Sequence, residues 1–145
     1  MQSKKISSVI IGAVIITLAV FSYQYISLNS STDIQITNVL HDIEFDAIFL
    51  DDEQVVKVTF EDHTGNTKFV TLEILGMDVT YHQEYTLDDN SGFVDIMSIE
   101  EVPKYGWKTT PVTLEIKHSK FGNIGLKTEI YHPGEPKPKI IVEQK

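Results

Sequence analysis

The sequence predicts an all-β protein, a single antiparallel β-sandwich of about 7–8 strands preceded by one N-terminal transmembrane helix. Two observations lead to this prediction. Between residues 34 and 132, apolar and polar residues alternate in short runs, as in strands with one buried and one solvated face. Ahead of them lies an uncharged apolar stretch long enough to span a bilayer.

Residues 1–28 are predicted to be a membrane anchor. No charged residue occurs from residue 6 to residue 32, and residues 6–28 would extend about 34 Å as a helix, which exceeds a hydrocarbon core of about 30 Å. Lys4 and Lys5 precede this stretch, and no basic residue follows before the first predicted strands. The positive-inside rule therefore keeps the N-terminus in the cytoplasm and places the domain outside.

The boundary after the apolar stretch leaves an alternative open. A cleaved secretory signal would release the domain, although no Ala-x-Ala site follows the stretch. Residues 29–33 read as a short polar linker, and Asn29 begins the Asn-x-Ser sequon of this linker. Asn29 is therefore a candidate glycosylation site, while a plain juxtamembrane linker explains the same residues equally well.

The predicted strands follow the linker in order. Runs of alternating apolar residues cover positions 34–40, 43–49, 56–60, 70–74, 79–86, 112–117 and 124–130. Residues 93–99 alternate less regularly and are expected at a sheet edge or around a bulge. Asp-, Asn- and Gly-rich turns separate the runs. Because no helical pattern is long enough to cross over a parallel sheet, the strands should pair antiparallel, with a sandwich favoured over a small barrel.

The C-terminal residues 133–145 form a proline-rich tail. Its first part, residues 133–138, contains three of the five prolines and should be extended. Residues 139–143 are apolar enough to form a strand. We expect the last strand of the same domain, which would cover a sheet edge. Pairing with a neighbouring molecule is the alternative.

Composition restricts the partners and the chemistry. The chain has no cysteine and no arginine, so disulfides, thiolate metal sites and bidentate guanidinium contacts are excluded. From Asp33 onward there are 21 acidic residues and 10 lysines, a net charge of 10 − 21 = −11. Such a surface repels nucleic acids and anionic lipid headgroups, so we expect no nucleic-acid partner.

Two parts of the chain each resemble a known group of proteins. Residues 34–131 resemble an immunoglobulin-like or fibronectin type III-like domain, without the Cys…Trp…Cys spacing of antibody domains. The basic start, the apolar segment and residues 4–10 resemble archaeal pilin-like and archaellum stator-like proteins, although no Gly or Ala follows the basic residues. The second resemblance implies a structural subunit of a surface filament or of its membrane base.

Catalytic signatures are not found in the sequence. The five histidines have no metal-ligand spacing, and there is no nucleophile motif or phosphate-binding glycine loop. Neighbouring acids such as Glu100 and Glu101 would point to opposite sides of an extended chain, so they should not form a catalytic dyad. The chain is therefore predicted not to be an enzyme.

One loop is a candidate calcium site. Asp88, Asn90 and Asp95 offer side-chain oxygens close together in sequence, and calcium prefers six to eight oxygen ligands. Their spacing does not follow the EF-hand register. The alternative is a plain polar turn, because Asp, Asn and Gly are common in turns.

Aromatic residues supply a candidate partner-binding surface. Tyr105, Trp107 and Phe121 lie in predicted loops, where aromatic side chains of a rigid sandwich often contact partners. The alternative is that Tyr105 and Trp107 cap the open end of the core. We therefore expect a non-catalytic protein-interaction module of the cell envelope. A filament subunit and a calcium-dependent accessory domain remain as alternatives.

Overall fold

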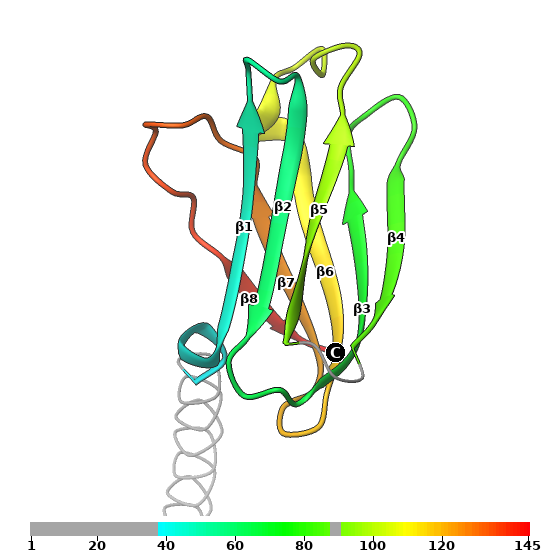
Figure 1. Cartoon of the computed structure of the whole chain (residues 1–145), viewed down its shortest axis with the longest axis vertical. Coiled ribbons are helices and arrows are strands. Elements are labelled where there is room, and N and C mark those ends of the chain that lie inside the picture. Colours follow the sequence, from blue (N-terminus) through cyan, green and yellow to red (C-terminus); the bar gives the residue numbers. More distant parts are fainter. Residues whose placement is uncertain (1–37, 88–90) are drawn as a thin grey trace, which may run out of the picture. The chain divides into compact units, whose positions relative to one another are not determined.

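Eight strands in two antiparallel sheets make up most of the part of the chain that the computed structural model describes, residues 38–87 and 91–145 (Figure 1). The expected all-β class and antiparallel pairing are therefore confirmed. The predicted anchor, the linker and Asn29 lie outside the described residues. Within the described residues, no helix has the length and apolar character needed to cross a bilayer.

The first sheet has three strands in the order β1-β2-β5. These are β1 (Ile43–Leu50), β2 (Val55–Asp62) and β5 (Gly92–Ser98). In the middle of the sheet Ala47 lies opposite Val58, which in turn lies opposite Asp95. The alternating residues of β1 and β2 turn their apolar members inward, as period-two patterns require. The less regular residues 93–99 thus form an edge strand, as expected.

The second sheet has five strands in the order β4-β3-β6-β7-β8. Their bounds are β3 (Thr67–Ile74), β4 (Tyr81–Thr86), β6 (Pro111–His118), β7 (Gly122–Glu129) and β8 (Ile141–Gln144). Strand β8 pairs antiparallel with β7, so the proline-rich tail ends as a strand of the same domain. This pairing covers the edge that β7 would otherwise leave open.

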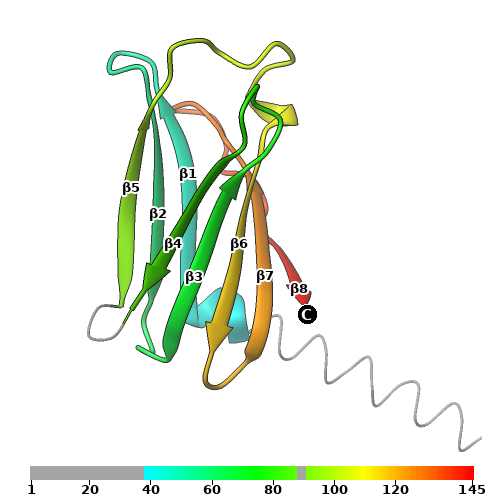
Figure 2. The same cartoon turned by 90° about the vertical axis from the view of Figure 1, so that its right-hand side faces the viewer.

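The core lies between the two sheets, which form two layers in Figure 2. Both sheets contribute their inward residues to it. Its largest fully buried side chains are Phe45, Phe49, Phe60, Leu72, Ile74, Leu114, Ile116 and Ile130. Burial of one such side chain stabilises the fold by about 1.5–3 kcal/mol relative to exposure. This apolar layer is the main reason that the chain needs no disulfide.

Two predictions about the strands were wrong. Residues 38–40, the described end of the run 34–40 that was expected to be a strand, belong to a helix over residues 38–42. Val39 is buried there, whereas Leu40, an apolar member of the expected alternation, is largely exposed, because a helix does not turn alternate residues to one face. Val79, expected on a buried strand face, lies in the loop before β4 and is 80% exposed.

The two ends of the sandwich carry different loops (Figure 1). We call one the Tyr105 end; it consists of residues 51–54, 75–80 and 99–110. The other, the His118 end, consists of residues 38–42, 63–66 and 119–121. The strands between them hold the two sets of loops on opposite sides of the core.

Candidate functional site

The Tyr105 end contains a groove of about 730 Å³. Residues 76–79, which connect β3 to β4, line one side of it, and residues 98–105, which follow β5, line the other. This volume is in the range of natural ligand pockets. The groove is therefore the candidate binding site of the domain.

Two glycines explain how these loops come together. A Cβ atom at Gly76 would lie 2.8 Å from the carbonyl oxygen of Thr109, and its φ of +82° also disfavours other residues. Gly76 therefore lets the β3–β4 loop approach the segment before β6. Gly106 has a φ of +77° and donates its N–H to the carbonyl of Pro103 over 2.8 Å, which forms the turn that presents Tyr105.

The rim of the groove is apolar and exposed. Val79, Val102 and Tyr105 expose 80%, 52% and 76% of their surface. Beneath them, Met77 packs against the core and Ile99 belongs to it. Exposed apolar groups at the mouth of a groove commonly mark an interaction surface.

The charges around the groove are mostly unpaired. Among the described residues, Asp78, Glu100 and Glu101 have no ion-pair partner within 4 Å. All three are exposed. Lys104 is the one basic residue of the lining, and its ammonium lies 5.3 Å from the centre of the Tyr105 ring. The groove thus combines apolar groups with a net negative charge.

The three aromatic residues predicted to bind a partner do not come together. Tyr105 lies at the groove. Trp107 is buried in the short 3-10 helix η1 (Trp107–Thr109), with its ring 4.6 Å from that of Phe49. It caps the core, as the alternative proposed. Phe121 is buried at the His118 end, where it stacks on His118. Only Tyr105 of the three is placed to contact a partner.

Sequence reasoning missed the other members of the groove. Val79 and Val102 are exposed only because the strands end before them, and their residue type alone suggests burial. The signal available in the sequence was the Gly76-Met77-Asp78 turn beside Val79. Nothing in the sequence placed this turn next to residues 98–105.

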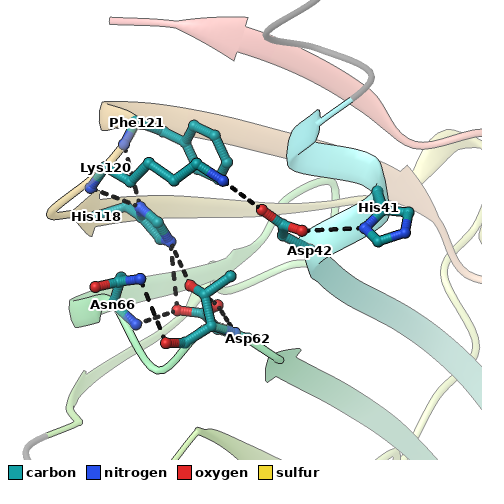
Figure 3. Close-up of polar contacts among 8 residues, drawn as sticks. His41, Asp42, Asp62, Asn66, His118, Lys120 and Phe121 are labelled. Atoms are coloured by element: carbon teal, nitrogen blue, oxygen red, sulfur yellow. Dashed lines mark hydrogen bonds and ion pairs between the residues drawn. The ribbon is translucent and has the colours of Figure 1, made fainter.

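The His118 end contains a second polar cluster, centred on Asp62 (Figure 3). The Asp62 side chain is fully buried. One carboxylate oxygen accepts hydrogen bonds from the Thr64 backbone N–H at 2.8 Å and the Thr64 hydroxyl at 2.6 Å. The other accepts from the backbone N–H groups of Asn66 and Thr67 at 2.9 and 2.7 Å. Burial opposes the charged form, but these hydrogen bonds prevail and lower the Asp62 pKa to about 2.

His118 completes this cluster. Its Nδ1 accepts the backbone N–H groups of Lys120 and Phe121, both at 3.1 Å. Nδ1 must therefore be unprotonated, and the ring proton resides on Nε2, which lies 3.3 Å from the Thr64 hydroxyl oxygen and 3.4 Å from an Asp62 oxygen. Burial lowers the pKa of His118, and the Asp62 charge only partly opposes this shift.

This arrangement has the groups of a hydrolytic site but not the access. The side chains of Asp62 and His118 have no exposed surface, and both ring nitrogens of His118 already have partners. The cluster instead joins the β2–β3 loop to the β6–β7 hairpin. Lys120 extends it by a 2.8 Å ion pair with Asp42, the last of the helical residues 38–42. We infer that the cluster centred on Asp62 and His118 has a structural role, holding these two connections together, and we call it the buried lock.

The predicted calcium ligands are only partly described. Asp88 and Asn90 lie outside the described residues. One carboxylate oxygen of Asp95 accepts hydrogen bonds from the hydroxyls of Tyr81 at 2.8 Å and Tyr85 at 2.5 Å. Burial, together with the Asp95 carboxylate, raises the pKa of Tyr81 to about 12. Within the described part of the chain, no group of three or more acidic or histidine side chains gathers in a metal-binding arrangement. The calcium site stays a prediction.

Comparison with known proteins identified no relative: no protein-family model, no curated protein and no solved structure matches the chain. Two local features of the described residues bear on function. One is the exposed groove at the Tyr105 end, and the other is the buried lock at the His118 end.

Proposed function

We propose that this chain is a non-catalytic interaction module of the cell envelope, held on the outer face of a membrane by residues 1–28. Its binding surface is the groove at the Tyr105 end. The single observation behind this proposal is the groove of about 730 Å³ with Val79, Val102 and Tyr105 exposed along its rim. A rigid sandwich that presents apolar groups on loops is a common arrangement for recognition.

The strand order supports an immunoglobulin-like assignment for the domain. If β1, β2, β3, β5, β6 and β7 are lettered A, B, C, E, F and G, the sheets read A-B-E and C-F-G. Strand β4 then lies beside C. Constant-type immunoglobulin domains divide these same letters between their sheets in the same way. In variable-type domains the B–C and F–G loops at one end contribute to the binding surface. By this lettering those loops lie at the His118 end, so the strand order supports the fold assignment and not the choice of the groove.

The buried lock supports a non-catalytic role. A general base must reach the proton that it abstracts. Both ring nitrogens of His118 are occupied inside the protein, and its side chain is not exposed. The buried Asp62–His118 pair therefore stabilises the fold and is not placed to act on a bound molecule.

The proposed location depends on the apolar residues 6–28 and on the two lysines before them. Protease added outside intact cells that make the full-length protein should digest the domain, while a cytoplasmic marker protein stays whole. A domain that is cut only after lysis would contradict the location. The mass of the native N-terminus separates an intact anchor from a processed filament subunit.

The proposed binding surface can be tested by photocrosslinking in the same cells. A photoreactive amino acid at position 105 should give a discrete crosslinked species, because the Tyr105 side chain points out of the domain. The matched control carries the same group at Glu84, an exposed residue of β4 outside the groove. Equal crosslinking from both positions, or none from position 105, would contradict the proposal.

A further inference from the structure

The groove at the Tyr105 end combines exposed apolar side chains with unpaired carboxylates in the described residues, and this combination restricts the class of partner that it can bind. We propose that it binds an extended peptide segment in which basic side chains flank an apolar one. This inference rests on the proposed function, in which the groove is the binding surface, and it adds the chemical class of the partner. The groove has an apolar part and a charged part, and each restricts the partner.

The apolar part explains why the segment must carry an apolar side chain. Val79 belongs to one of the two loops that line the groove, and Val102 and Tyr105 belong to the other. Ile99 is buried beneath them and Met77 is partly buried. An apolar side chain placed among these residues would remove their exposed surfaces from water, at about 25 cal/mol for each Å² buried.

The charged part explains why the flanking side chains must be basic. Asp78, Glu100 and Glu101 surround the apolar groups and have no ion-pair partner in the described part of the chain. Nine other carboxylates of the described residues, in contrast, lie within 4 Å of a lysine or histidine nitrogen, as Glu73 does with His82 and Asp51 with His132. The groove is thus a place where negative charge remains free for a partner.

The same charges argue against other occupants. The sequence from Asp33 onward has a net charge of 10 − 21 = −11. A second copy would bring two acidic surfaces together, and like charges in an interface are repulsive. Nucleic acid and anionic lipid are repelled for the same reason. A basic and apolar peptide is the class that satisfies both parts of the groove.

The test measures binding of labelled peptides to the full-length chain in nanodiscs of zwitterionic lipid, with empty nanodiscs as the background. The probe is a short peptide in which lysine and leucine alternate. One comparison peptide replaces lysine by glutamate, and the other replaces leucine by serine. We expect the lysine–leucine peptide to bind at least about tenfold more tightly than either comparison peptide, and less tightly as salt is raised.

Two matched variants locate the binding. E100Q combined with E101Q should lower the affinity for the lysine–leucine peptide by about three- to tenfold, since each exposed ion pair contributes modestly to binding. E44Q combined with E84Q removes the same charge from exposed sites outside the groove, and should change binding by less than about twofold. Y105S tests the apolar part of the groove. It should weaken binding of the lysine–leucine peptide more than binding of the comparison peptide in which serine replaces leucine.

Three outcomes would overturn the inference. They are equal binding of the glutamate–leucine peptide, equal weakening by the two charge variants, and no binding of the lysine–leucine peptide at all. The photocrosslink from position 105 then shows which proposal has failed. A discrete crosslink in cells with no peptide binding would refute the basic partner and leave the groove as the binding surface. If the lysine–leucine peptide binds at the groove, as the variants would show, but position 105 gives no crosslink in cells, only the proposed role as an interaction module in the cell envelope is refuted.

Discussion

The two ends of this sandwich treat charge in opposite ways. At the His118 end, a fully buried carboxylate receives four hydrogen bonds from three residues, and a buried histidine uses both ring nitrogens. At the Tyr105 end, three carboxylates stay exposed and unpaired within the described residues, next to exposed apolar side chains. A buried charge must be paired or hydrogen-bonded within the protein, whereas an exposed charge is solvated by water and is accessible to a partner. The first end therefore stabilises the fold, and the second is the surface that we propose for recognition.

The largest effect should come from removing the carboxylate of the lock. Asp62→Ala would leave the backbone N–H groups of Thr64, Asn66 and Thr67 without an acceptor in the interior. We expect the free energy of unfolding to fall by about 3–5 kcal/mol, measured by urea denaturation. Asp78→Ala at the groove is the control and should change it by less than about 0.5 kcal/mol. Similar effects at the two ends would contradict the comparison.

A somewhat smaller loss is expected in the core at the Tyr105 end. Trp107→Ala removes the ring that packs on Phe49 at the Tyr105 end, and should cost about 3–4 kcal/mol in unfolding free energy. In the described part of the chain the Trp107 Nε1 group has no hydrogen-bond partner. Trp107→Phe should therefore cost only about 1 kcal/mol, since it loses packing but no hydrogen bond. Equal losses for the two variants would show that the indole nitrogen matters.

The pH dependence of stability sharpens the role of His118. Its pKa is lowered from 6.5 in the folded protein, so the unfolded chain binds more protons below about pH 6.5, and stability must fall as the pH falls through that region. His118→Asn keeps an acceptor for the amides of Lys120 and Phe121 but cannot titrate. Its urea stability should vary less between about pH 8 and about pH 5 than that of the parent chain. Parallel curves would exclude His118 as the titrating group.

Protonation of Asp62 should cause a second loss of folding stability at a more acidic pH. Because its folded pKa of about 2 is below the ordinary value of 3.8, its contribution is complete above the ordinary value and disappears as the pH falls from about 4 to about 2. Urea titrations of the parent chain and Asp62→Asn over this interval measure it. The difference between the two chains should shrink as the pH falls. A constant difference would contradict the hydrogen-bonded carboxylate.

The smallest effect on folding is expected at the rim of the groove. Tyr105→Ser and Val79→Ser alter exposed side chains, so each should change the unfolding free energy by less than about 0.5 kcal/mol. The same substitutions should reduce the photocrosslinking and peptide binding proposed above. A thermal melt and a binding curve on the same sample separate the two effects. A rim variant that unfolds the domain would mean that these residues belong to the core.

Much of the fold was visible in the sequence. Alternation is a local property, so residues 43–49, 56–60, 70–74 and 112–117 were recognised as strands and lie within β1, β2, β3 and β6. Residues 38–40 were predicted as strand but are helical, because alternation and helical spacing cannot be separated over so few positions. The candidate site was recognised only through Tyr105, since a hydrophobic residue such as Val79 gives no sign in the sequence that it will be exposed.

By itself, the sequence determined the class of fold, the absence of disulfides and arginine contacts, and the strong negative charge of the domain. These depend only on residue type and on spacing over a few positions. The tertiary structure alone decided that Asp62 meets His118 and that the Gly76 turn meets residues 98–105. Both depend on which strands pair across the sheets, and that choice is made by the packing of the whole core.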